Sequence, residues 1–278
     1  MERVKSLEQY SALIKEVRQT HSSVQTNCYM LPDAVEKQLS KNKLFALDVG
    51  AGIALIIDEG AFYQLYYYVG LNETILFDRK DKPVILDQIY LQNKKTESVV
   101  QIEKKWLDCG FHNYKTYRHI TLKMTQEQLD GIPLSLDDEN YVMVKAKPSD
   151  TEAVSKLWTS SLDVLSTALP EPEEISELIE QGLVFCARSE ASGKIGAVMK
   201  LEYQRGVYLI HHVVVDSDHR RQGLAKRLYD YCYRLTGTEG TQYYGWVDVN
   251  NIPSLQLHLS KGWKFNGRLT SQLLLDSK

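Results

Sequence analysis

A turn between an apolar run and an amphipathic segment carries the residues best suited to bind an anion. The β-branched run Val213–Val215 leads through a polar connector into Arg220-Arg221-Gln222-Gly223-Leu224-Ala225. Apolar residues then recur at helical spacing, at Leu224, Leu228, Cys232 and Leu235. The first backbone N–H groups of a helix have no partner within the helix, and the helix dipole favours an anion there. Because a glycine lets phosphate approach the main chain, the turn predicts a phosphate site flanked by Arg220 and Arg221.

A second block of small and polar residues follows farther along the chain. Its pattern is Asn251-x-x-Ser254-x-x-x-His258-x-x-x-Gly262-Trp263. Asn251 and His258 are about two helical turns apart, so one helix face would present both side chains. Together, the two blocks resemble the signature blocks of the GNAT family, the acyl-CoA-dependent N-acyltransferases. The chain departs from the usual pattern at Ser217, where proline is common, and at His258, where the family usually has tyrosine.

The resemblance implies acetyl-CoA, or another acyl-CoA, as co-substrate and no metal. Backbone groups of Val213 and Val215 would pair with the pantetheine arm as if it were an added strand, and the same run would polarise the thioester carbonyl. The pyrophosphate would rest on the amides of the glycine turn. Asn251 would contact the pantetheine arm or the leaving sulfur, and Ser254 would pack nearby. The expected cofactor-binding residues are Val213, Val214, Val215, Arg220, Arg221, Gln222, Gly223, Leu224, Ala225, Asn251 and Ser254.

Acyl transfer to an amine needs a neutral amine and an acid that protonates the leaving thiolate. The resemblance places His258 opposite that thiolate, and a histidine pKa near neutrality suits a proton donor. The alternative for His258 is a packing or surface role.

Two adjacent histidines, His211 and His212, precede the apolar run and are the candidates for the base. Neighbouring side chains of a strand point to opposite faces, so only one of them would face the reacting amine. His211 would then share its face with Val213 and Val215, and His212 with Val214. Asp248 is a third candidate, and a chain of water molecules is the alternative to any single side chain.

The order of predicted elements is repeated along the 278 residues, which is a comfortable length for two domains. Strand-like runs near 44–46, 53–57 and 62–69 correspond to runs near 184–187, 195–200 and 207–215, and Trp106–Phe111 corresponds to Leu259–Trp263. The resemblance then implies an α/β fold of two tandem GNAT-like domains, each a mostly antiparallel mixed sheet flanked by helices. We expect the domains at 1–125 and 141–278, joined by a polar linker at 126–140.

The first copy lacks a phosphate turn, because Val69 is followed by Gly70-Leu71-Asn72-Glu73-Thr74 rather than by Arg-x-x-Gly-x-Ala. We therefore expect a degenerate first domain without a cofactor. Its aromatic run Phe62–Val69 predicts a buried strand.

Composition excludes several classes of protein. With 43% hydrophobic and 25% charged residues the chain is of ordinary globular type, and a net charge of −3 gives no case for nucleic acid or an anionic membrane. Cys28, Cys109, Cys186 and Cys232 lack metal-ligand spacing, and the first residues lack the apolar core of a signal peptide. We expect reduced thiols in a cytoplasmic protein, with no membrane segment.

The leading interpretation is an N-acetyltransferase that moves an acetyl group from acetyl-CoA to a primary amine of a small molecule or peptide. A tandem enzyme that transfers aminoacyl groups from charged tRNA is a second interpretation, but it predicts a basic groove that the net acidity disfavours. A third is a non-catalytic module that senses acyl-CoA, in keeping with the missing tyrosine. The sequence leaves the acceptor and the oligomeric state open.

Overall fold

The computed structural model describes residues 1–278, which form two compact units. Unit 1 comprises Met1–Tyr117 and Gly267–Lys278, and unit 2 comprises Arg118–Asn266. These bounds differ from the domains expected at 1–125 and 141–278, because the last residues of the chain pack in unit 1. The segment 126–140 lies within unit 2 rather than outside both units. There it forms helix α4 (Gln126–Asp130) and buries Leu136, which is 4% exposed.

Unit 1 is a mixed sheet in the order β1-β3-β4-β5-β6-β13, with β2 beside β5. Neighbouring strands of this sheet are antiparallel except β5 and β6, which run parallel. Its elements are β1 (Glu2–Arg3), α1 (Leu7–Thr20), β2 (Val24–Thr26), α2 (Pro32–Ser40), β3 (Leu44–Asp48), β4 (Gly52–Asp58), β5 (Tyr63–Gly70), β6 (Val84–Leu91), α3 (Glu97–Asp108) and, from the end of the chain, β13 (Lys264–Leu275).

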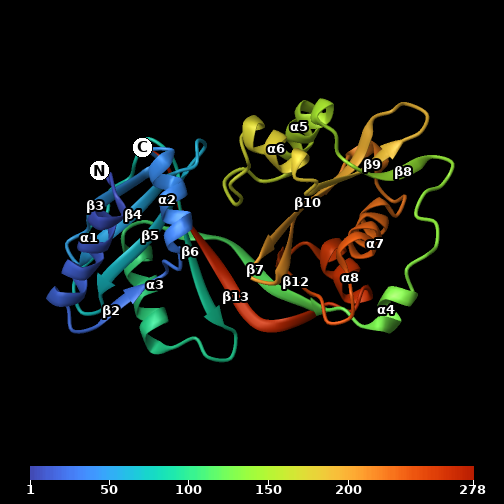
Figure 1. The fold of residues 1–278 in the computed structure, drawn as a ribbon. Coiled ribbons are helices and arrows are strands. Elements are labelled where there is room, and N and C mark those ends of the chain that lie inside the picture. The colour runs from blue at the N-terminus through green and yellow to red at the C-terminus, as the bar shows by residue number, and fades with distance from the viewer. The chain divides into compact units, whose positions relative to one another are not determined.

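Helices of unit 1 lie on both faces of this sheet (Figure 1) and pack apolar side chains against it. Helices α1 and α2 pack Tyr10, Val17 and Val35 against one face. Helix α3 packs Ile102 and Trp106 against the other. The expected burial of the aromatic strand is confirmed, since Tyr63, Tyr67 and Tyr68 are all less than 9% exposed. Edge-to-face and tilted ring contacts around Trp106 add to this burial.

Unit 2 repeats the arrangement in the order β7-β12-β11-β10-β9-β8. Strands β8 to β11 pair antiparallel, and β11 and β12 run parallel. Its elements are β7 (His112–Lys123, shared with unit 1), α4, β8 (Tyr141–Lys145), η1 (Pro148–Asp150), α5 (Thr151–Ser161), α6 (Pro172–Glu180), β9 (Val184–Ser189), β10 (Ile195–Gln204), β11 (Val207–Val215), η2 (Ser217–His219), α7 (Leu224–Thr236), β12 (Gln242–Asp248) and α8 (Ile252–Ser260).

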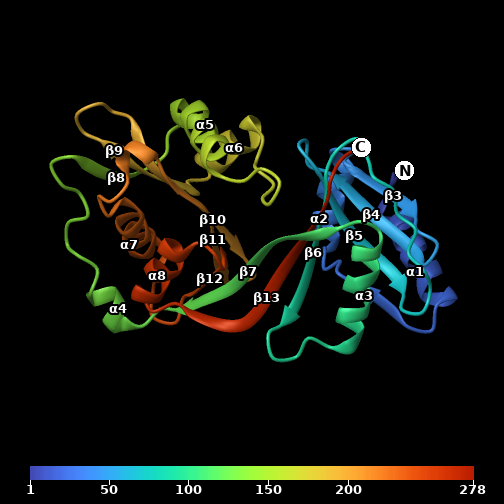
Figure 2. The same cartoon turned by 180° about the vertical axis from the view of Figure 1, so that it is seen from behind.

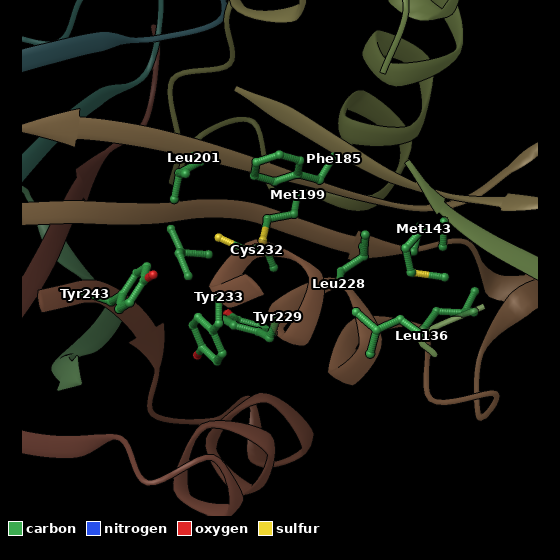
Figure 3. Packing of buried hydrophobic residues seen from close by; sticks show 14 of the residues in the cluster. Leu136, Met143, Phe185, Met199, Leu201, Leu228, Tyr229, Cys232, Tyr233 and Tyr243 are labelled. Carbon is green, nitrogen blue, oxygen red and sulfur yellow. The ribbon is translucent and has the colours of Figure 1, made fainter. Parts of the chain in front are cut away.

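Two apolar clusters lie on opposite faces of the strands of unit 2. Helices α5 and α6 cover one face, and α7 and α8 the other (Figures 1 and 2). Figure 3 shows Leu228 and Cys232 of α7 beneath Met199 and Phe185 of the strands. The predicted stripe of α7 is buried at Leu224, Leu228 and Cys232, but Leu235 at its end is 46% exposed. None of the helices in either unit has the length and apolar character needed to cross a membrane.

Each unit takes its last strand from beyond its own repeat. Strand β7 follows α3 in the sequence but lies beside β12, with Arg118 and the residues after it in unit 2. Strand β13 (Lys264–Leu275) follows α8 but pairs with β6 from Leu275↔Val84 to Arg268↔Leu91. The duplication that the sequence predicts is therefore present in strand order, with the two terminal strands exchanged.

Candidate functional site

Strands β11 and β12 pair over only part of their length. Their parallel ladder joins Val207–Leu209 to Gln242–Tyr244, although β11 continues to Val215 and β12 to Asp248. From Ile210 onward, the edge of β11 that faced β12 therefore carries no neighbouring strand. Backbone N–H and C=O groups along such an edge can pair with an extended ligand that contains amide groups.

A β-bulge interrupts β11 just beyond this point. Val214 pairs with Val198 and His211 with Lys200, so β11 holds one residue more than β10 between these pairs. The extra residue is accommodated at His212, whose φ is 48°. His211 consequently shares a face with Val214, not with Val213 and Val215, and the two histidine rings lie 5.6 Å apart. The expectation that the two histidines point to opposite faces is wrong, because it assumed an unbroken alternation.

The predicted phosphate turn connects β11 to α7. Arg221 and Gly223 both have left-handed backbones, with φ of 63° and 72°. Gly223 is the N-cap of α7, where no side chain caps the helix and no acidic residue stands in the first turn. Nothing lies within 4 Å of the position that a Cβ of Gly223 would take. Arg220 and Arg221 are exposed beside this uncapped helix end, an arrangement that suits a phosphate anion.

The other members of the predicted cofactor set surround this turn. Leu224 is buried at 1% exposure, so only its backbone is available to a ligand, while Gln222 is exposed and Ala225 is partly buried. Val214 packs in the cluster under α5 and α6, and Val213 and Val215 pack against the cluster under α7.

Asn251 and Ser254 begin helix α8. The Asn251 side chain caps the helix, since its Oδ1 accepts a hydrogen bond from the Ser254 backbone N–H at 3.1 Å. The backbone carbonyl of Ser254 in turn accepts from Nδ1 of His258 at 2.7 Å. Both residues thus order the helix in this structure, and contact with a pantetheine arm stays a prediction.

His258 is 7% exposed and lies between α8 and α7. Because its Nδ1 donates to the Ser254 carbonyl, its Nε2 accepts, and the Tyr229 hydroxyl donates to it at 2.7 Å. The Tyr229 and Trp263 rings meet the imidazole edge to face. Burial lowers the pKa of His258, so the ring is neutral near pH 7. The role of proton donor stays a prediction, and this geometry does not favour it.

His211 belongs to a charged group that spans β10 and β11. Glu202 Oε2 lies 3.5 Å from His211 Nε2 and 3.5 Å from Lys200 Nζ. His211, followed by Lys200, lowers the pKa of Glu202 to about 2, so this carboxylate stays ionised. Burial lowers the pKa of His211, which leaves a neutral imidazole that can accept a proton.

His212 and Asp248 are less suited to proton transfer. The Trp158 indole donates to the His212 backbone carbonyl at 2.9 Å and its ring packs on the imidazole. Burial lowers the pKa of His212 to about 3. Asp248 accepts a hydrogen bond from the Asn250 backbone N–H in the turn that follows β12.

In unit 1, too, the two parallel strands stop pairing part-way along their length, a feature that we call the strand divergence. Residues of unit 1 itself occupy it there. Strands β5 and β6 stop pairing after Leu65 and Leu86. The Asn27 side-chain amide donates to the carbonyls of Leu65 and Asp87, and its oxygen accepts from the Tyr67 backbone N–H. Strand β2 then covers the rest of the edge, from Tyr68 to Gly70. The connection from β5 to β6 contains no helix, so unit 1 also lacks a counterpart of the α7 N-terminus.

The sequence patterns did not point to Glu202 or Tyr229 as site residues. Glu202 is a lone acid within the apolar run of β10, which could have drawn attention to it. Tyr229 stands at an ordinary helical core position, and no local signal pairs it with His258. No group of three or more histidine, cysteine, aspartate or glutamate side chains is placed to hold a metal ion, and all four cysteines are unpaired.

Comparisons with known proteins agree with this architecture. Residues 152–263 match the model of the acetyltransferase (GNAT) family. The fold is similar to a GCN5-related N-acetyltransferase from Sphaerobacter thermophilus, with a TM-score of 0.54 at 14% identity over 96% of this chain and 91% of that one. A GCN5-related N-acetyltransferase from Kribbella flavida matches with a TM-score of 0.53 at 12% identity, over 88% and 94% of the two chains.

A tandem GNAT protein from the clavulanic acid biosynthesis pathway has a TM-score of 0.52 to this chain at 12% identity. That match covers 82% of this chain and 79% of the tandem protein. No curated protein matches the sequence. The strand divergence, the uncapped glycine turn and the family match at 152–263 together make unit 2 a domain of the GNAT acetyltransferase family, in a chain that has the tandem GNAT fold.

Proposed function

We propose that the protein is an N-acetyltransferase that binds one acetyl-CoA in unit 2 and transfers the acetyl group to a primary amine. The observation that carries this proposal is the unoccupied edge of β11 from Ile210 to Val215, which leads directly to the uncapped N-terminus of α7. An amide-rich arm fits the edge, and a pyrophosphate fits the helix end beside Arg220 and Arg221.

His211 is the base in this proposal. An amine reaches the site as an ammonium ion, and its proton passes to the neutral His211 imidazole, which the Glu202 carboxylate stabilises once it is charged. The amine nitrogen then bonds to the thioester carbonyl carbon. The carbon–sulfur bond breaks, the nitrogen loses its second proton to solvent to give the amide, and the coenzyme A thiolate leaves and takes up a proton from solvent. Backbone N–H groups beside the bulge would stabilise the oxyanion of the intermediate.

Calorimetry with acetyl-CoA tests the cofactor site. We expect one equivalent bound per chain, because residues 23–27 already occupy the matching edge of unit 1. Gly223→Asp should weaken binding by at least about 100-fold, since a carboxylate would meet the phosphate at close range. The matched control is Gly240→Asp, which also places aspartate at a positive φ (88°) with open space around its Cβ. Two equal sites, or equal affinities for the two variants, would refute the proposal.

A non-catalytic acyl-CoA sensor is the second candidate. The observation that favours it is that both ring nitrogens of His258 are hydrogen-bonded within the protein, to Tyr229 and to the Ser254 carbonyl. Release of free coenzyme A in the presence of primary amines separates the two functions. Saturable binding of acetyl-CoA without thiol release from any amine would support the sensor.

A further inference from the structure

One face of the unit 2 strands carries a row of side chains at the point where β11 and β12 stop pairing. Glu202 on β10 pairs with Leu209 on β11, and Leu209 pairs with Tyr244 on β12. Cross-strand partners stand on the same face of a sheet, so the carboxylate and the phenol lie on either side of Leu209. The opposite face holds Tyr203, Tyr208 and Tyr243, which belong to the α7 side.

Tyr244 and Trp246 form an aromatic surface on this face. They are separated by one residue of β12, so both rings stand on the same side of the strand. His119 of β7 packs against both, with ring centroids 5.5 Å from Tyr244 and 4.6 Å from Trp246. His119 is itself 8% exposed and contacts the Asn266 side chain, so the rings rest on a fixed support. Yet Trp246 remains 36% exposed.

The Glu202 carboxylate beside this surface carries a permanent negative charge. Glu202 stays ionised, and after burial its charge is the next cause that raises the pKa of Tyr244. Lys200 offsets part of this charge from 3.5 Å, while the neutral His211 ring supplies a proton acceptor. A carboxylate next to aromatic faces is the combination that recognises an organic cation.

The position of the surface connects it with acyl transfer. Tyr244 is the last residue of β12 that pairs with β11, and Trp246 follows where the strands have separated. The acyl group of a thioester on the β11 edge would lie at this point. We propose that the acceptor is a primary amine carried by an aromatic or similarly flat apolar group, whose ring rests on Tyr244 and Trp246 and whose ammonium group lies beside Glu202 and His211.

This inference rests on the proposed acetyltransferase function and narrows its substrate class. The ammonium group gives one proton to His211, its nitrogen bonds to the acetyl carbon and loses a second proton to solvent, and coenzyme A leaves as the thiolate. An aliphatic amine of similar basicity would make the same ionic contacts without the ring contacts. The ring contacts should therefore act mainly on KM, while the chemical step is common to both amines.

Rates with 2-phenylethylamine and propylamine, measured by thiol release from acetyl-CoA, test the inference. For the full-length protein, kcat/KM should be at least about tenfold higher for 2-phenylethylamine. Trp246→Ala should raise KM for 2-phenylethylamine until its roughly tenfold advantage in kcat/KM is lost, and should change kcat/KM for propylamine by less than about twofold. Trp246→Phe should restore the advantage of 2-phenylethylamine. Tyr203→Ala is the control, because it removes another exposed aromatic side chain (58%) from the opposite face.

The outcomes separate this inference from the proposed function. Failure to bind acetyl-CoA in calorimetry would refute both. Binding of acetyl-CoA with equal kcat/KM for the two amines, or with transfer to neither, would overturn the inference alone. A Trp246→Ala variant that loses activity equally toward both amines would also overturn it, since Trp246 would then support the fold or the chemistry rather than the acceptor.

Discussion

At the scale of single residues, the hydrogen-bond partners of His258 indicate a structural role rather than the predicted catalytic one. Its position in the second signature block predicted a proton donor, but both ring nitrogens have partners within the core. We infer that His258 connects α7 to α8, together with the neighbouring ion pair between Lys261 and Asp230.

His258→Ala should therefore act first on stability. It leaves the buried Tyr229 hydroxyl without its acceptor and opens a cavity, and we expect a loss of about 2–4 kcal/mol in the free energy of unfolding. Denaturant titration measures this loss, and the turnover number of the folded variant should change by less than tenfold. A fall of roughly 10²–10⁴-fold in turnover with unchanged stability would instead identify His258 as a general acid.

At the scale of elements, the strand divergence of unit 1 depends on buried polar groups. The Asn27 amide takes the place of a peptide group between β5 and β6 and holds them apart. Next to it on β6, Asp87 has a buried Oδ1 without a hydrogen-bond partner, and Gln64 donates to its Oδ2 at 3.3 Å.

Burial raises the pKa of Asp87 to about 6, against 3.8 for an unperturbed carboxyl. The folded state then binds this proton more tightly than the unfolded state, so its contribution to stability is present below about pH 4 and is lost as the pH rises through about 6. Asp87→Asn should remove the dependence of the free energy of unfolding on pH between about 4 and 6. It should also stabilise the protein at pH 7 by up to about 3 kcal/mol. Unfolding measured from pH 4 to 8 checks this, with exposed Asp33→Asn as the control. An unchanged profile would contradict it.

At the scale of the whole molecule, the exchange of terminal strands makes each unit depend on distant sequence. Leu273, Leu274 and Leu275 are at most 6% exposed and complete the sheet of unit 1 beside β6. Each buried leucine contributes about 1.5–3 kcal/mol, and a domain is stable by only about 5–15 kcal/mol.

Deletion of residues 267–278 should therefore unfold unit 1, while unit 2 keeps its acetyl-CoA site. Limited proteolysis and calorimetry on the truncated chain would show cleavage confined to residues 1–117 and one equivalent of acetyl-CoA. Deletion of 276–278 alone, which lies beyond β13, is the control. A protease-resistant unit 1 in the longer deletion would mean that β13 is dispensable.

Local patterns in the sequence were sufficient for most of the architecture. Strands β4, β5 and β11 and helix α7 appear where apolar periodicity predicts them, because burying one face of an element requires that periodicity. The glycine turn after β11 was equally readable, since positive φ and an uncapped helix start are local properties.

Only the tertiary structure decided how these elements share their partners. The exchange of β7 and β13 depends on pairing between strands far apart in the chain, which periodicity does not specify. The bulge at His212 breaks the alternation on which the face assignment of the two histidines relied. The pairing of His258 with Tyr229, and the row from Glu202 to Trp246, follow from packing and register between separate elements, so no spacing within one segment could have revealed them.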